Sequence, residues 1–231
     1  MKAVVSKMEL ASLVSKIQNV IPNKPAIPIV ANVLIEAVDN QLILNVTDLM
    51  ISVKCFTEAT IIEEGSIVLP ARKFFSLVKE FTSPQVKITT NLNNTAEIVS
   101  GSSSFKINGT SKSEFPVTQE FVGNSEISIP QNKLKEMLYS VIFCAAKENT
   151  RYTINGVCLR AANGVLTAIG TDGKRFARTK IKIAIDSSFQ GEYLLPIKTT
   201  EEMIKMLEDI DASATLSFMS DKIFLENDKH H

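Results

Sequence analysis

The chain repeats its own pattern at a spacing of 124 residues, and this repeat limits the possible folds more than any other feature of the sequence. The apolar residues of two segments return one repeat later. These are Leu10, Leu13, Val14 and Ile17, which recur as Leu134, Met137, Leu138 and Val141, and Val33, Ile35, Leu42 and Thr47-Asp48, which recur as Val157, Leu159, Leu166 and Thr171-Asp172. Repeats are typical of architectures in which similar units stack or encircle. Function is therefore expected to follow first from shape.

A shorter repeat lies inside each half. The spacing i, i+3, i+4, i+7 of the set that begins at Leu10 returns in the first half from Phe74, and that of the set that begins at Leu134 returns in the second half from Thr200. The residues concerned are Phe74, Leu77, Val78 and Phe81, and then Thr200, Met203, Ile204 and Leu207. The chain is thus predicted to hold four similar units of about 60 residues, grouped as two pairs.

Each unit is expected to contain a short strand, an amphipathic helix and further strands with alternating apolar residues. Ser6 with Glu9, and Thr199 with Glu202, have the form of a capping box at a helix start. Hairpin turns are predicted at Asp39-Asn40 and at Asn163-Gly164. Strands are predicted at 3–5, 32–37, 41–46, 51–56, 66–69, 86–90, 96–100 and 103–108, with a matching set in the second half.

The 231 residues suffice for two ordinary domains. The segment from Thr110 to Ser125 lacks periodicity and lies where the repeat restarts. We therefore expect a first domain at 1–112, a linker at 113–125 and a second domain at 126–231. Two helices and several antiparallel strands per domain predict an α+β fold with the helices on one face of the sheets.

The composition disfavours several classes of function. Basic and acidic residues balance at 25 each, so overall charge predicts no attraction to nucleic acid or membrane. No histidine lies in the interior of the sequence to act as a general base, and no Cys, His and carboxylate cluster has the spacing of a metal site. Cys55, Cys144 and Cys158 are far apart and no secretion leader opens the chain, which favours a reducing cytoplasm. We predict neither enzyme activity, metal nor cofactor.

One glycine-rich segment, residues 170–175, ends in Gly-Lys as a phosphate-binding loop does. Ala168 replaces the first required glycine and Arg175 replaces the magnesium-binding Ser or Thr, so a nucleotide site is disfavoured. Asp48 and Asp172 are equivalent under the repeat. Their expected role is to form turns by accepting bonds from backbone N–H groups two residues further on.

Every expected helix has at least two basic residues on or beside it. These are Lys7, Lys16 and Lys24; Arg72, Lys73 and Lys79; Lys133, Lys135, Lys147 and Arg151; and Lys198 and Lys205. If the helices line one surface, that surface is basic and can hold a phosphate backbone without reading its bases. The alternative is a set of ordinary solvated helix faces, which Glu201, Glu202 and Glu208 support.

Four motifs resemble the bacterial DNA polymerase III β sliding clamp family. They are the segments 70–75 (PARKFF), 114–116 (EFP), 151–156 (RYTING) and 170–177 (GTDGKRFA), and the resemblance covers essentially the whole chain. It implies a DNA clamp fold of which this chain has the first two of three domains. A fragment is therefore expected, and its own oligomeric state is left open.

The resemblance also implies two sets of site residues. Lys24, Arg72, Lys73, Glu148, Tyr152 and Lys198 match positions at or near the double-stranded DNA. Ile154, Thr171, Gly173, Lys174, Arg175 and Phe176 match an apolar cleft that binds partner peptides. Without the resemblance, Ile154 and Phe176 would be interpreted as core residues.

The resulting hypothesis is a non-enzymatic processivity factor that tethers the replicative polymerase to DNA. The implied partners are double-stranded DNA, the DNA polymerase III catalytic subunit, the clamp loader and repair polymerases, with a homodimeric ring in the full-length protein. The alternative is an interaction scaffold that binds short peptides without encircling DNA.

Overall fold

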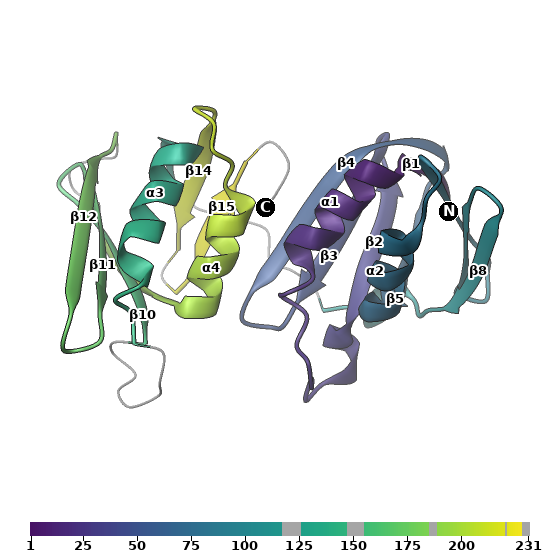
Figure 1. Cartoon of the computed structure of the whole chain (residues 1–231), viewed down its shortest axis with the longest axis horizontal. Helices are drawn as coiled ribbons and strands as arrows, with labels where there is room; N and C mark the ends of the chain where they lie inside the picture. The colour runs from purple at the N-terminus through teal and green to yellow at the C-terminus, as the bar shows by residue number, and fades with distance from the viewer. Residues whose placement is uncertain (117–125, 147–154, 185–188, 220, 228–231) are drawn as a thin grey trace. The chain divides into compact units, whose positions relative to one another are not determined.

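The computed structural model describes residues 1–116, 126–146, 155–184, 189–219 and 221–227. The chain divides into two compact units, Met1–Gln119 and Glu120–Lys229. Each unit carries a pair of helices packed on antiparallel strands (Figure 1), which confirms the predicted α+β class.

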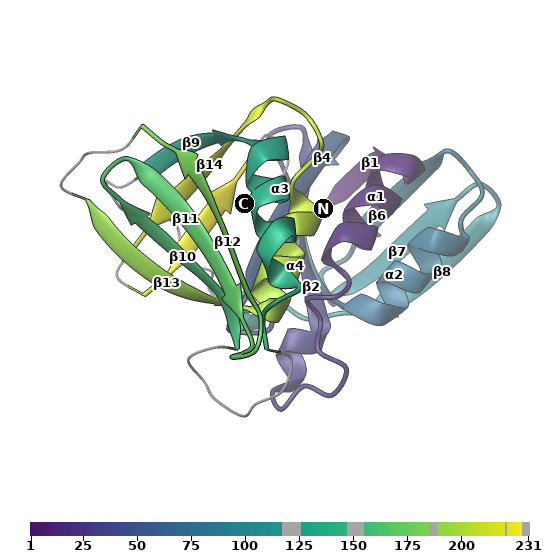
Figure 2. The same cartoon turned by 60° about the vertical axis from the view of Figure 1, so that its left-hand side comes forward.

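The first unit begins with a strand and a helix and then alternates strands with a second helix. Its elements are β1 (Lys2–Ser6), α1 (Lys7–Ile17), η1 (Pro28–Ala31), β2 (Asn32–Val38), β3 (Gln41–Thr47), β4 (Ser52–Glu63), β5 (Gly65–Pro70), α2 (Ala71–Glu80), β6 (Gln85–Thr90), β7 (Thr95–Ser100), β8 (Ser103–Asn108) and η2 (Lys112–Glu114). The strands form one sheet in the order β5-β2-β3-β4-β1-β6-β7-β8, and α1 and α2 lie side by side against it (Figures 1 and 2).

Strand β4 is longer than predicted. It runs to Glu63 because its first part pairs with β3, from Ser52 to Glu58, and its last part pairs with β1, from Ala59 onward. No side chain of β4 after Phe56 is fully buried. The alternation of apolar residues in the sequence therefore did not predict the second half of this strand. One long strand thereby joins the two halves of the sheet.

The second unit repeats this order in shorter form. Its elements are β9 (Glu126–Pro130), α3 (Gln131–Ile142), β10 (Gly156–Ala162), β11 (Val165–Thr171), β12 (Phe176–Lys182), β13 (Gln190–Pro196), α4 (Ile197–Met206), β14 (Ser213–Phe218) and β15 (Ile223–Glu226). Among the described residues they form two sheets, in the orders β12-β11-β10-β13 and β15-β14-β9.

The repeat in sequence is a repeat in structure. Strands β1, β2 and β3 begin at Lys2, Asn32 and Gln41, and one repeat later β9, β10 and β11 begin at Glu126, Gly156 and Val165. The two hairpin turns also match. Asp39 and Asn40 have φ of 50° and 59°, and Asn163 and Gly164 have φ of 53° and 70°. These are the left-handed angles of a type I′ turn.

Three of the four helices that the structure describes have proline at the N-cap. Pro70, Pro130 and Pro196 each end a strand and precede α2, α3 and α4, where a missing N–H costs no helical hydrogen bond. Helix α1 instead has a side-chain cap, in which Ser6 Oγ accepts from Glu9 N. The capping box predicted at Thr199 is wrong, because α4 has already begun at Ile197.

Both units bury an apolar core between helices and sheets. In the second unit the stripe Leu134, Met137, Leu138 and Val141 of α3 packs with the inward residues of β10 and β11. Phe115 is also buried in the first unit, where it is 5% exposed and packs on Leu34 and Val68. The beginning of the aperiodic segment is therefore packed on the first unit, where β5 also bridges Thr110.

Candidate functional site

Basic residues gather at one end of the helix pair of the first unit. Helix α2 supplies Arg72 and Lys73, both exposed, and the segment after α1 supplies Lys24, also exposed. Arg72 Nη2 donates hydrogen bonds to Pro22 O at 3.3 Å and to Asn23 Oδ1, and Asn23 directly precedes Lys24. The fold thus brings the three cations together. We call Lys24, Arg72 and Lys73 the basic edge.

The members of the basic edge differ in their partners. Neither Lys24 nor Lys73 forms a side-chain hydrogen bond or an ion pair with any other residue that the structure describes, whereas Arg72 is bonded to the loop. Lys79, two turns after Arg72 on the same face of α2, donates to Gln18 Oε1. Two ammonium groups are therefore available to an anionic ligand at this edge.

The other expected DNA-binding residues, Glu148, Tyr152 and Lys198, do not belong to the basic edge. Lys198 is half-buried in the first turn of α4 in the second unit. Glu148 and Tyr152 lie outside the described residues.

The turn between β11 and β12 holds most of the expected cleft residues. Asp172 Oδ1 accepts the backbone N–H groups of Lys174 and Arg175 at 2.9 and 2.8 Å, and Thr171 Oγ1 accepts that of Gly173 at 3.1 Å. The Thr171 hydroxyl in turn donates to Arg175 O at 2.7 Å. These bonds fix the backbone of residues 171–175, which we call the Asp172 turn.

The first unit contains the same turn. Asp48 Oδ1 accepts from Met50 N at 3.0 Å and Ile51 N at 2.8 Å, and Thr47 Oγ1 accepts from Leu49 N at 2.9 Å. The predicted turn-forming role of both aspartates is confirmed. The two turns differ in their exposed side chains, which are apolar in the first unit and basic in the second.

Electrostatics also favour an ionised Asp172. The backbone N–H groups of Arg175 and Lys174, together with the Arg175 side chain, lower the pKa of Asp172 from 3.8 to about 2. Arg175 Nε lies 3.0 Å from Asp172 Oδ2, so the carboxylate holds the guanidinium in place. The side chain of Lys174 remains exposed and unpaired among the described residues.

Phe176 stands beside this turn as the first residue of β12, paired with Thr171. Its side chain is 63% exposed, so its interpretation as a core residue is wrong. The reason is that β12 turns its odd-numbered residues inward and its even-numbered residues out. An apolar ring next to the basic side chains of Lys174 and Arg175 can bind a ligand with apolar and acidic groups. Ile154, the remaining cleft residue of the prediction, is outside the described residues.

The glycine-rich segment is not a phosphate-binding loop. It joins two antiparallel strands, with Thr171 opposite Phe176, and does not lead into a helix whose N-terminus could hold phosphates.

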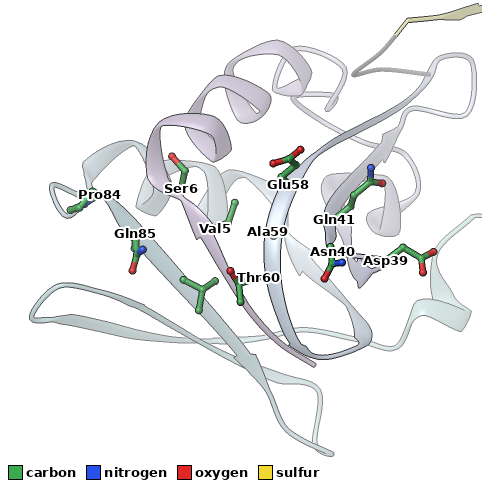
Figure 3. Close-up of a pocket in the computed structure, with 11 residues that line it drawn as sticks. Val5, Ser6, Asp39, Asn40, Gln41, Glu58, Ala59, Thr60, Pro84 and Gln85 are labelled. Carbon is green, nitrogen blue, oxygen red and sulfur yellow. The ribbon is translucent and has the colours of Figure 1, made fainter.

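A hollow of about 650 Å³ lies where β4 passes from β3 to β1 (Figure 3). Its wall includes Ser6, Asp39, Glu58, Thr60 and Gln85. Of the described residues that line it, none is a Lys, Arg, His or Cys. The hollow therefore offers no cation to a ligand, and its two carboxylates would repel a phosphate.

Two other kinds of site are absent from the described ranges. No group of three or more His, Cys, Asp or Glu side chains there could hold a metal ion. Nor does any helix described here have the length and apolar character needed to cross a bilayer.

The sequence did not identify the residues that accept hydrogen bonds from Arg72. Asn23 and the carbonyl of Pro22 carry no signal of their own, because an exposed Asn between prolines looks like any loop residue. The basic residues on and beside the helices, together with the family resemblance, pointed to this region.

Both halves of the chain match family models. The model for the N-terminal domain of the DNA polymerase III beta subunit matches residues 1–119, and the model for the central domain matches residues 128–231.

Similar proteins include beta sliding clamps of two Chlamydia species. The clamp of Chlamydia pneumoniae is 42% identical over 228 residues, which are 99% of this chain and 62% of the relative. That of Chlamydia muridarum is 37% identical over 226 residues, which are 98% and 62%. The chain thus spans about 62% of the length of these curated relatives.

Solved structures show the same fold. The sliding clamp of Bacillus subtilis matches with a TM-score of 0.94 at 26% identity, over 100% of this chain and 63% of that one. A Pseudomonas aeruginosa sliding clamp bound to griselimycin matches with a TM-score of 0.93 at 24% identity, over the same shares.

Proposed function

Because this chain belongs to the family of DNA polymerase III beta subunits, we propose that it is part of a sliding clamp, a non-catalytic processivity factor that encircles duplex DNA. The observation that carries the proposal is the family match over both halves of the chain. The proposed partners are DNA, the DNA polymerase III catalytic subunit, the clamp loader and repair polymerases. The complete protein forms a homodimeric ring in the cytoplasm.

The domain organisation belongs to the same proposal. Residues 1–112 form the first clamp domain and residues 126–231 the second, with 113–125 between them.

The basic edge supplies contacts to the DNA backbone in this proposal, together with Glu148, Tyr152 and Lys198. Exposed ammonium groups attract phosphates by releasing counterions, which gives weak and sequence-independent binding. Weak contacts suit a clamp that must slide, since a base-specific contact would hold it at one site. Lys24 and Lys73 are the two members of the basic edge with no partner among the described residues.

The Asp172 turn with Phe176 and Ile154 supplies one wall of a partner-peptide site. Its backbone is held by hydrogen bonds, and the exposed ring of Phe176 offers an apolar surface. The griselimycin-bound clamp of Pseudomonas aeruginosa is a ligand-binding protein of the same fold, which supports a ligand site on a clamp. This observation also favours the second candidate, an interaction scaffold that binds peptides without retaining DNA.

The proposal is tested by the salt dependence of DNA binding. Affinity falls as salt rises, so a plot of log affinity against log salt has a negative slope. We expect Lys24→Gln and Lys73→Gln each to lower the magnitude of this slope by about one, because each removes one phosphate contact. Fluorescence anisotropy of a labelled duplex over a potassium chloride series measures this slope, and two unrelated duplex sequences should behave alike.

The matched control is Lys87→Gln. Lys87 is an exposed lysine of β6 whose neighbours along the strand, Val86 and Ile88, are buried, so it points away from the core. It should leave the slope unchanged. If all three variants lowered the slope equally, general charge and not the basic edge would explain the binding. If no variant changed it, the DNA-binding assignment would fail and the peptide scaffold would be favoured.

A further inference from the structure

The segment that carries Lys24 has little means of holding its own shape. The structure describes no helix or strand between the end of α1 at Ile17 and the start of η1 at Pro28. Pro22, Pro25 and Pro28 have no backbone N–H, so this stretch can form few hydrogen bonds of its own. We call residues 21–27 the Lys24 loop.

The Lys24 loop is anchored at its two ends and at one point between them. Ile21 is 6% exposed, and Val30, just beyond the loop, is 4% exposed, so both are held in the core. Between them Asn23, Lys24 and Ile27 are exposed. The hydrogen bonds from Arg72 to Pro22 O and Asn23 Oδ1 are made at this exposed stretch, directly before Lys24.

The guanidinium group suits this task. Both bonds come from Nη2, whose two N–H groups lie in the rigid plane of the guanidinium and so hold the carbonyl and the amide oxygen in fixed directions. Arg72 lies in the first turn of α2, a helix held in the core by Phe74 and Phe75. A rigid element thereby fixes an otherwise weakly held loop.

We propose that Arg72 acts as a positioning residue that braces the Lys24 loop, so that the ammonium group of Lys24 is presented to its ligand in one place. This inference rests on the proposed DNA-binding function of Lys24. It differs from the role that the family resemblance implies for Arg72, which is a contact to DNA of its own. Lys79 of the same helix donates to Gln18 Oε1 at the end of α1, before the Lys24 loop begins.

The first test needs no DNA. Nitrogen-15 relaxation of this chain, measured by NMR, reports backbone mobility in residues 21–27 and in α2 separately. We expect Asn23→Ala and Arg72→Gln each to lower the backbone order parameter of Lys24 from about 0.85, the value of a rigid backbone, toward about 0.6, the upper limit of a flexible one. The order parameters of α2 should not change. The control Lys73→Gln removes a neighbouring cation without touching the loop and should have no effect. An unchanged order parameter of Lys24 in Asn23→Ala and Arg72→Gln would overturn the inference.

The second test asks whether the brace works through Lys24. Asn23→Ala removes no charge, yet it should weaken binding of a labelled duplex by about two- to tenfold. Its effect should vanish in the Lys24→Gln background, because two residues that act through one contact are not additive. Arg72→Lys, which keeps the charge and loses the planar fork, should behave like Asn23→Ala.

The outcomes separate the two proposals. Additive effects of Arg72→Gln and Lys24→Gln, each lowering the salt slope by about one, would make Arg72 a direct phosphate contact and overturn the brace while DNA binding stands. If the wild-type chain bound no duplex at any salt concentration, DNA binding by this chain would fail. The relaxation experiment would then decide the brace alone.

Discussion

Gly173 and Leu49 occupy the same place in the two repeats, and both have left-handed backbone angles, with φ of 84° and 75°. Such angles suit glycine and strain a residue with a Cβ. Leu49 nevertheless keeps this conformation while 54% exposed. The hydrogen bonds of Thr47 and Asp48 therefore determine the turn even where the residue disfavours it.

Gly173→Ala should lower the free energy of unfolding by about 1–2 kcal/mol, the cost of a left-handed angle for an L-residue. A Cβ at this position would meet no atom within 4 Å, so backbone strain is the only cost. Urea denaturation followed by circular dichroism measures it. Asn tolerates this region better, so Gly173→Asn should cost less than Gly173→Ala; equal costs would contradict this explanation.

The pKa of Asp172, lowered to about 2, predicts a pH dependence of stability. The folded-state pKa lies below the ordinary value of 3.8, so the carboxylate stabilises the turn fully above that value. The stabilisation should disappear as the pH falls from about 4 to about 2. Comparing the thermal midpoints of the wild type and Asp172→Asn across this range measures the difference.

The Asn variant is a suitable comparison because its side-chain oxygen can still accept the two N–H groups without ionising. The difference in thermal midpoint between the wild type and Asp172→Asn should be largest near neutral pH. It should disappear as the pH falls through the folded-state pKa. A gap that stayed constant would mean that ionisation of Asp172 contributes nothing.

At the scale of elements, the two repeats differ in how closely a helix approaches its sheet. Gly170 of β11 replaces Val46 of β3, and a Cβ at Gly170 would overlap the carbonyl oxygen of Val141, near the end of α3. Val46, in contrast, is fully buried in its own core. The absence of a side chain at Gly170 thus lets α3 lie against β11.

Gly170→Ala should therefore lower the free energy of unfolding by about 3 kcal/mol, the upper range for overpacking, since the obstacle is backbone and cannot rotate away. Gly191→Ala is the matched control. The atoms nearest to a Cβ at Gly191 would be ring atoms of Tyr193 and Phe189, and a side-chain ring can shift more easily than a backbone carbonyl. Chemical denaturation of both variants tests this. An equal loss in the two would show that close helix packing is not the cause.

At the scale of the whole molecule, the two proposed activities depend on different residues in different units. The basic edge lies in the first unit, and Phe176 with the Asp172 turn lies in the second. Ligand binding and the salt dependence of DNA binding should therefore respond to different substitutions.

Phe176→Ala should weaken binding of a short peptide with apolar and acidic side chains to the proposed ligand site by about tenfold, a typical loss for a central aromatic contact, and should leave the salt slope of duplex binding unchanged. Isothermal titration calorimetry gives the affinity. Phe105→Ala removes another partly exposed ring, on β8 of the first unit, and should leave the affinity unaltered. If Phe176→Ala bound this peptide as tightly as the wild type, the assignment of Phe176 to the ligand site would be incorrect.

The sequence by itself determined the repeat, the strands that share its register and the tight turns. These features depend on local chemistry. The alternation of apolar residues sets which residues face the core, and Asp39-Asn40 and Asn163-Gly164 tolerate the left-handed angles of a hairpin. The turn-forming role of Asp48 and Asp172 follows from the same local chemistry, because each carboxylate accepts N–H groups of its own turn.

Only the tertiary structure decided what surrounds each side chain. Phe176 is apolar, but β12 turns it outward. Arg72 looks like one more surface cation until the fold places it against Asn23, which lies 49 residues away in the sequence. Hydrogen-bond partners from distant segments depend on which segments the fold brings together, and periodicity within one segment carries no information about them.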